Sequence, residues 1–247
     1  FNLRGTASGW VGEVAPRPET ATPTFGSMDF QTGEIYANPA ATQQMLDDGE
    51  VDLESWLAGE VETEFAYQEG LAFVSGTGAN GRPNGILTYV TGGANAAANP
   101  LGAITTVNSG AAASITSDGI VNLTQALPTA FSQNARFAMN KGTIGAIRLL
   151  KDTTGNYLWQ PSYQAGTPST LLGYAISEIA AMPALAASSK SVLFGDFART
   201  YLIIDRVGTR ILRDPYTNKP FVMFYTTKRV GGGVVSPESM KALNTSV

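Results

Sequence analysis

The chain has 247 residues, of which 43% are hydrophobic and 15% are charged, with a formal net charge of −4. It contains no cysteine and no histidine, which excludes disulfides, thiol nucleophiles, Cys/His zinc sites and Ser–His–Asp triads. The net negative charge argues against a general nucleic-acid binder. The charged fraction is low compared with about 25% in a typical domain, which indicates a surface that neighbouring subunits cover.

Two strand-like segments open the chain, at residues 3–14 and 24–37, and both are rich in Thr, Phe, Val and Ile. The sequence between them, APRPETATP, holds three prolines, which forbid a tight hairpin. The pattern predicts a long two-stranded ribbon with a stiff tip. Because an isolated ribbon is only marginally stable, we expect another subunit to support it.

A long helix is predicted over residues 52–74, after a short helical turn at 41–46. Asp52 is placed as its N-cap and Gly76 as a left-handed C-cap. The polar face is acidic. The apolar residues recur at the i, i+3, i+4 spacing of one buried face: Leu53, Trp56, Leu57, Val61, Phe65 and Ala72.

The helix runs into SGTGANGRPNGIL, residues 75–87, in which Gly76, Gly78 and Gly81 match GxGxxG. A dinucleotide site needs a strand before these glycines and a helix after them, so that helix N–H groups face the pyrophosphate. Here a helix precedes the glycines and Arg-Pro-Asn-Gly follows them. The motif therefore predicts a reversal of the chain, and we expect no cofactor.

The rest of the chain is typical of an α/β lobe followed by further strands. Helices are predicted over 117–127 and 141–151, and strands over 103–107, 135–139, 191–194, 201–205, 209–212 and 221–230. RDPYTNK forms an exposed tip before the last of these strands, and a strand and a short helix close the chain. No run of residues approaches the roughly 20 apolar residues that span a bilayer.

The order of these parts resembles the major capsid proteins of tailed bacteriophages, which have the Hong Kong 97 fold. The most specific stretch is residues 42–87, where a short turn ending in Leu-x-Asp precedes a "spine" helix, then Gly-x-Gly and Pro-x-Gly-Ile. The opening GWVGEVAPRPETATPTF and the ending TTKRVGGGVVSPESMKAL also carry the resemblance. It covers the chain from Leu3 to Leu243.

The resemblance implies an α+β fold of the Hong Kong 97 type with three parts. An E-loop ribbon takes residues 1–37. A P-domain with the spine helix takes 38–114 and 200–230, and an α/β A-domain takes 115–199 and 231–247. The family also has an N-arm and often a cleaved scaffolding segment upstream, so we expect this chain, which begins at Phe1, to be the remainder of a longer protein.

The function that the resemblance implies is that of a shell subunit in a phage or a phage-derived particle such as a gene transfer agent. Such subunits form hexameric and pentameric capsomers of an icosahedral-type head. The expected partners are further copies of the chain, packaged DNA without sequence-specific binding, a portal and, in some heads, decoration proteins, with no membrane. The expected location is the virion, assembled in the bacterial host cytoplasm.

Two loops are expected to form interfaces, one at the E-loop tip and one where three capsomers join. The predicted interface residues are Arg17, Glu19, Arg213, Asp214, Asn218 and Lys219. Around a threefold axis, Arg213 of one subunit can pair with Asp214 of the next. Some family members weld their shells through an E-loop lysine and an asparagine, but Arg17 stands at that place here and its guanidinium stays protonated, so we expect no such bond.

Two alternatives remain. A bacterial nanocompartment shell shares the fold and differs in cargo. An enzyme of the glycoside hydrolase type would need two carboxyl groups about 5 Å apart, yet glutamates on a polar helix face are usually solvated. The tryptophans Trp10, Trp56 and Trp159 favour core or interface anchors over a sugar platform. The enzyme candidates are Glu60, Glu62, Glu64, Glu69 and Asp196, the last near Ser188 and Lys190. No catalytic, cofactor-binding or metal-binding residue is assigned.

Overall fold

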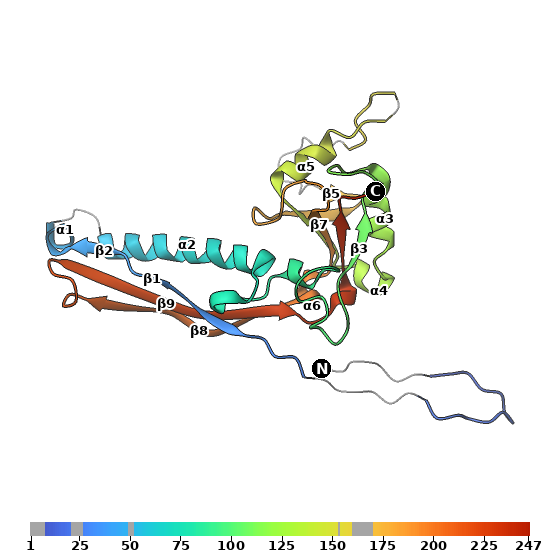
Figure 1. Cartoon of the computed structure of the whole chain (residues 1–247), viewed down its shortest axis with the longest axis horizontal. Coiled ribbons are helices and arrows are strands. Elements are labelled where there is room, and N and C mark those ends of the chain that lie inside the picture. The colour runs from blue at the N-terminus through green and yellow to red at the C-terminus, as the bar shows by residue number, and fades with distance from the viewer. Residues whose placement is uncertain (1–7, 21–26, 49–51, 153, 160–169) are drawn as a thin grey trace.

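Two β-sheets organise the chain into a long arm and a lobe, from which an N-terminal segment extends (Figure 1). The computed structural model describes residues 8–20, 27–48, 52–152, 154–159 and 170–247. Its mixed helices and sheets fit the predicted α+β class.

The arm is built on a four-stranded antiparallel sheet. Strand β9 (Phe221–Val234) is its centre, because β1 (Thr32–Ala37), β2 (Ala40–Thr42) and β8 (Tyr201–Asp214) all pair with it. Strands β8 and β9 form a long hairpin that reaches the free end of the arm (Figure 1).

Helix α2 (Leu53–Ser75) lies along one face of this sheet, after the short α1 (Gln43–Asp48) (Figure 1). The Asp52 carboxylate accepts the Ser55 N–H at 3.2 Å, which confirms the predicted N-cap. Near this end, Leu53 and Leu57 pack against the buried Val222 and Phe224 of β9. The helix therefore covers the sheet with most of the stripe that its sequence period predicted, Trp56 being the exception.

The expected left-handed C-cap at Gly76 is wrong, although the chain does reverse there. Gly76 has φ −59° and ψ 140°, and its N–H donates to the Ala72 carbonyl. The left-handed residues are Gly78, Asn80 and Gly81, with φ +77°, +54° and +75°, in and beside η1 (Ala79–Gly81). A Cβ on Gly76 would lie 2.3 Å from the Pro83 carbonyl oxygen, so this glycine is needed for close packing and not for its φ.

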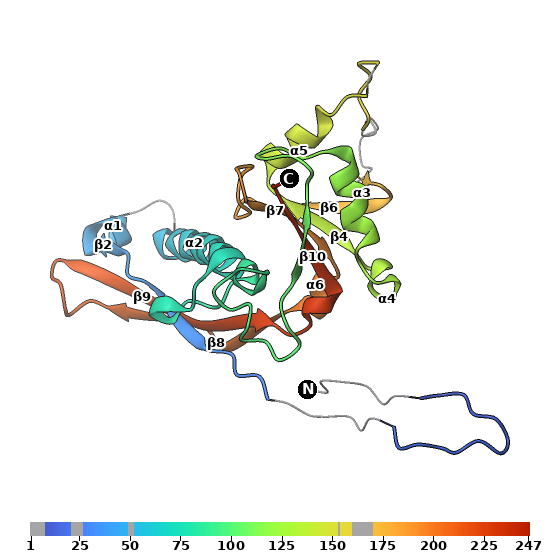
Figure 2. The same ribbon diagram turned by 45° about the vertical axis from the view of Figure 1, so that its right-hand side comes forward.

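The lobe contains a six-stranded mixed sheet with helices on one face (Figure 2). Its core stacks Phe137 on Phe194, with ring centroids 4.5 Å apart, beneath Leu123 of α3 and Ile147 of α5. The strand order is β3 (Thr105–Asn108), β10 (Met240–Asn244), β7 (Lys190–Gly195), β4 (Arg136–Met139), β6 (Tyr174–Glu178) and β5 (Thr170–Leu171). The short elements are α3 (Ser117–Gln125), α4 (Thr129–Ser132), α5 (Lys141–Arg148), α6 (Phe197–Thr200), η2 (Ile86–Tyr89) and η3 (Pro237–Ser239).

The partly buried Tyr201, beside the buried Tyr89, fastens the glycine turn to the arm where the arm meets the lobe. The Tyr201 hydroxyl donates to the Asn84 carbonyl at 2.8 Å, and the Tyr201 ring packs edge-on against Phe73 of α2. Burial raises the pKa of Tyr201 well above its ordinary value, with a further contribution from Tyr89. Both phenols therefore stay neutral at any physiological pH and act as structural groups.

Three sequence-based expectations are corrected by non-local pairing. The strand expected over residues 3–14 is absent from the described part, 8–14, and β1 pairs with β9 in its place. The strands expected over 201–205 and 209–212 are a single strand, β8, with two register shifts. Of the expected closing helix only the 3₁₀ turn η3 (Pro237–Ser239) forms, and the residues after it are strand β10, because Met240 and Ala242 bury their side chains in the lobe sheet.

The expected domain limits cut across these sheets. Strand β3 lies in the lobe, although residues 38–114 were assigned to the P-domain. Strand β9 passes residue 230 and still pairs with β8 as far as Val234. The division into E-loop, P-domain and A-domain remains a prediction.

Candidate assembly surfaces

The N-terminal segment 8–20 has no contact surface of its own in one subunit. Every residue from 8 to 20 is exposed, Trp10 at 106% and Val14 at 99%. The predicted interface residues Arg17 and Glu19 lie on it, and in both views the segment lies away from the arm and the lobe (Figures 1 and 2). Exposed aromatic side chains of this kind are typical of surfaces that bind another protein.

The tip between β8 and β9 carries the other predicted interface residues, and Asp214 shapes it. Its carboxylate accepts the N–H groups of Tyr216 and Thr217 at 2.9 and 3.2 Å and the Thr217 hydroxyl. These bonds, the hydroxyl first, lower the pKa of Asp214 below its ordinary value. The Asn218 carbonyl accepts the Phe221 N–H, and Lys219 is exposed.

Arg213 already has a partner within the subunit. Its guanidinium Nε lies 3.2 Å from a carboxylate oxygen of Glu54, in the first turn of α2, and both side chains are about half exposed. The expected pairing of Arg213 with Asp214 of another subunit would therefore compete with Glu54 and with the turn that Asp214 holds.

The sheet face opposite α2 is open and aromatic. Because side chains alternate along a strand, the buried Val222 and Phe224 face α2 while Tyr225 faces away. Tyr225 lies 6.4 Å from Tyr36 of β1, ring centroid to ring centroid, and opposite Leu212 of β8. All three of these outward side chains are exposed, so this face is a second surface that no other described part of the subunit covers.

The outward face of α2 also bears aromatic residues, which corrects one expectation. Trp56, expected on the buried stripe, is 55% exposed, and Tyr67, three turns further along, is 57% exposed. Gly59 lies between these two residues and Gly70 lies just after Tyr67. At both glycines an added Cβ would meet no atom within 4 Å. Two glycines in a helix interior cost stability without serving any contact inside the chain.

Gly59→Ala is expected to raise the free energy of unfolding of the separated subunit by about 0.5–1 kcal/mol, since alanine is the better helix former and the site is open. Urea unfolding followed by circular dichroism measures this. Gly81→Ala is the matched contrast: its φ of +75° should turn the same substitution into a loss of about 1 kcal/mol. Equal changes in the free energy of unfolding at both positions would contradict the open helical site at Gly59 and the left-handed backbone at Gly81.

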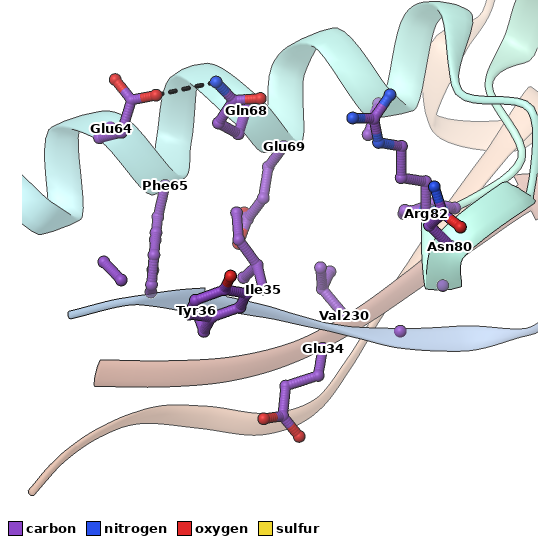
Figure 3. A pocket seen from close by; sticks show the side chains of 15 residues that line it. Glu34, Ile35, Tyr36, Glu64, Phe65, Gln68, Glu69, Asn80, Arg82 and Val230 are labelled. Carbon is purple, nitrogen blue, oxygen red and sulfur yellow. Dashed lines mark hydrogen bonds between the residues drawn. The ribbon is translucent and has the colours of Figure 1, made fainter. Parts of the chain in front are cut away.

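A groove of about 440 Å³ lies between α2 and β1 (Figure 3). Phe65 and Val230 reach into it, the Gln68 amide donates to Glu64 at 2.8 Å, and Glu34 points away from it. On its helix side, Glu69 forms an ion pair with Lys228 of β9 at 2.6 Å, and both side chains are largely buried. This pair ties the helix to the sheet and contains no nucleophile or free acid for catalysis.

The glycines of the GxGxxG match form a turn that is packed against other parts of the chain, although Gly81 also borders the groove beside β1. A Cβ on Gly33 of β1 would lie 1.4 Å from the Gly81 carbonyl oxygen, and one on Gly78 would lie 2.5 Å from the Asn84 side chain. The turn packs directly on β1. We expect ATP or NAD to leave the melting temperature of the subunit unchanged, and a shift of several degrees would contradict this.

The enzyme candidates do not assemble into one site. Glu60, Glu62 and Glu64 are exposed on α2, and Glu69 is bound to Lys228. In the lobe, Asp196 follows the last residue of β7 and caps α6 through the Ala198 and Arg199 N–H groups. Lys190 begins β7, about 20 Å away along the strand, and the Ser188 N–H donates to the Thr245 carbonyl.

A hollow of about 700 Å³ opens beside α6 in the lobe, and sequence reasoning missed it. Arg136 of β4 and Arg199 of α6 line it, both with exposed side chains. Arg199 lies over the Phe131 ring at 5.8 Å and 3.7 Å from the buried Asp196 carboxylate. Strand pairing brings these arginines together from positions 63 residues apart, so no local pattern signals the site.

In the part of the chain that the structure describes, no group of three or more His, Cys, Asp or Glu residues could hold a metal ion. No described helix is long and apolar enough to cross a membrane. Trp159, one of the expected anchors, packs against the lobe core and donates its indole N–H to the Thr170 carbonyl at 2.9 Å.

Comparison with known proteins gives a consistent result across the chain. Residues 2–245 match the family described as the phage capsid family. A solved capsid of a native GTA particle is 39% identical, with a TM-score of 0.89, and the match covers 100% of this chain and 84% of that one. The capsid of an empty GTA particle is 38% identical, with a TM-score of 0.87, covering 100% and 83%.

More distant structures share the fold alone. A chain of Gordonia phage Cozz is 13% identical with a TM-score of 0.68, covering 100% of this chain and 80% of that one. The SrpI encapsulin of Synechococcus elongatus PCC 7942 is also 13% identical, with a TM-score of 0.61 and coverage of 86% and 73%. No curated protein matches the chain.

Proposed function

Because this chain belongs to the phage capsid family and is a structural shell protein with the Hong Kong 97 fold, we propose that it forms the hexameric and pentameric capsomers of a closed DNA-containing particle of the gene-transfer-agent or phage type. Its chemistry is packing between copies. No catalytic group is required, and none of the sequence-based enzyme candidates meets another in a shared site.

The observation that carries the proposal is the exposure of segment 8–20. A single subunit leaves Trp10 and Val14 fully in water, although burial of such side chains is worth about 1.5–3 kcal/mol each. Repeated contact with neighbours is the arrangement that recovers this free energy at every subunit. We propose that the segment is the E-loop, that the arm is the P-domain and that the lobe is the A-domain.

Electron microscopy and light scattering of the purified chain test the proposal. We expect large closed particles of uniform diameter. A chain that stays monomeric or forms only irregular aggregates under all assembly conditions would overturn it. Nuclease protection of DNA in particles isolated from the producing bacteria tests the enclosed cargo, which we expect to be held without base-specific contacts because the subunit is acidic overall. We further propose assembly in the host cytoplasm on a portal, with decoration proteins in some heads.

We also propose that the β8–β9 tips of three capsomers meet and that Asp214 of one tip faces Arg213 of the next. Asp214→Asn keeps the oxygen that accepts the turn's N–H groups and removes the charge. One exposed pair is worth about 0–1 kcal/mol, so we expect a weakening of assembly of up to about fivefold at low salt and none at high salt. Light scattering against ionic strength measures this, and an unchanged salt dependence would contradict the contact.

The same carboxylate predicts a pH dependence of the tip. Because the folded pKa of Asp214 is lowered, its stabilisation of the turn is present above the ordinary aspartate pKa of 3.8 and is lost as the pH falls below that value. The tip should therefore be unchanged by pH between 5 and 8, where Asp214 stays ionised.

A further inference from the structure

The solvent-facing side of α2 carries aromatic side chains together with glutamates that form no ion pair among the described residues. Glu60 and Glu64 are one helical turn apart and lie on the same flank as Trp56 and Tyr67, so the four side chains form one continuous strip. Across residues 8–20, 27–48, 52–152, 154–159 and 170–247, neither glutamate has a cationic partner within 4.0 Å. Glu62 is exposed on the other flank, about 200° around the axis from Glu60.

The hollow beside α6 has the opposite charge, because its exposed charged groups are arginines. Its one carboxylate, Asp196, is buried, accepts two backbone N–H groups and lies 3.7 Å from the Arg199 Nε. Arg136 has no carboxylate within 4.0 Å in the described ranges. The walls between the charges are made of the apolar Ala138, Ile179, Phe197 and Ala198 and the polar Asn134 and Ser177, so the hollow offers a cationic rim over a largely apolar lining.

We propose that the strip Trp56–Glu60–Glu64–Tyr67 of one subunit docks on the Arg136–Arg199 hollow of a second copy of the chain. The two surfaces match in both properties: aromatic side chains meet apolar walls, and two unpaired carboxylates meet two exposed guanidinium groups, which bind carboxylates well. Helix α2, which carries the strip, lies on the arm (Figure 1), and β4, which lines the hollow, belongs to the lobe sheet. Glu60 is about 20 Å along the helix from its lobe-proximal end.

Such a contact is heterologous, because each copy uses a different surface. Contacts of this kind form rings when the rotation between copies closes and filaments when it does not. The inference rests on the proposed function, in which copies are arranged in capsomer rings. It also explains Gly59 and Gly70: beside the strip, the absence of side chains lets a neighbouring surface approach the helix backbone closely.

A charge swap tests the contact. Three variants are made in the full chain: Glu60→Lys with Glu64→Lys, Arg136→Glu alone, and all three substitutions together. The matched control is Glu62→Lys, the same change on the other flank of the same helix. Sedimentation velocity gives the concentration at which half of the subunits assemble, and thermal unfolding of the separated subunits verifies that each variant folds.

The helix variant and the hollow variant are each expected to raise this concentration by at least about tenfold, because like charges then face each other. The triple variant should recover most of the loss, and Glu62→Lys should stay within about twofold of the parent. The inference fails, while the proposed function stands, if the variant with Glu60→Lys and Glu64→Lys assembles normally. The same holds if adding Arg136→Glu to that variant does not recover its assembly. A parent chain that never associates overturns both the inference and the proposed function.

Discussion

Replacing Trp10, Val11 and Val14 with serine is expected to abolish particle formation while the melting temperature of the separated subunit stays unchanged. In one subunit these side chains contact nothing that could stabilise the fold, since the whole of 8–20 is exposed. In a shell, each serine substitution would remove about 1.5–3 kcal/mol of burial free energy from every copy of the chain. Light scattering measures particle formation, and differential scanning calorimetry of unassembled subunits measures stability.

The matched control is Val247→Ser, which changes another strongly exposed valine outside the segment and should leave both measurements unchanged. A serine variant with normal particles would show that segment 8–20 is not an assembly element. A serine variant that melts earlier as a separated subunit would show that the segment packs on its own chain.

Lys228→Met is expected to lower the free energy of unfolding by about 3–5 kcal/mol, the largest effect of any single substitution considered for the arm. The change leaves the Glu69 carboxylate, only 14% exposed, without its cation beneath α2. Chemical unfolding of the separated subunit measures the loss. The ion pair joins the middle of α2 to β9, so the helix should loosen from the sheet in this variant.

The double variant Glu69→Leu with Lys228→Met controls for the loss of the ion pair itself. Removing both charges and keeping the volume is expected to restore stability to within about 1–2 kcal/mol of the parent, because no unpaired charge stays buried. If the double variant is as unstable as Lys228→Met, then shape and not charge holds the two elements together.

Much of the fold follows from local signals in the chain. Asp52 begins α2, the periodic apolar residues place the helix on a partner, and the turn of glycines ends it. The helices and strand of the lobe's first half, α3, β4 and α5, lie within a few residues of their expected bounds. Caps, periods and breakers act over a few residues, which is why they can be read without a structure.

For the assembly surfaces, too, the sequence predicted some features and not others. The segment with Arg17 and Glu19 is exposed, as is the tip from Arg213 to Lys219 apart from the half-buried Asp214 and Pro215, in line with what the sequence indicated. The sequence did not indicate that Arg213 pairs with Glu54 or that Asp214 bonds its own turn, because Glu54 lies far away in the chain and the turn geometry depends on the hairpin. Their pairing between subunits stays a prediction.

The sequence by itself determined the shell-subunit class, the long acidic helix and the glycine reversal, since each depends on neighbouring residues or on the order of parts. Only the tertiary structure decided that β10 is a strand, that β8 is continuous, and that Trp56 faces solvent while Leu57 packs on β9. A helical period shows which residues share a side, but the partner sheet fixes where the edge of the buried stripe falls. The hollow of Arg136 and Arg199 likewise exists only because strand pairing brings distant residues together.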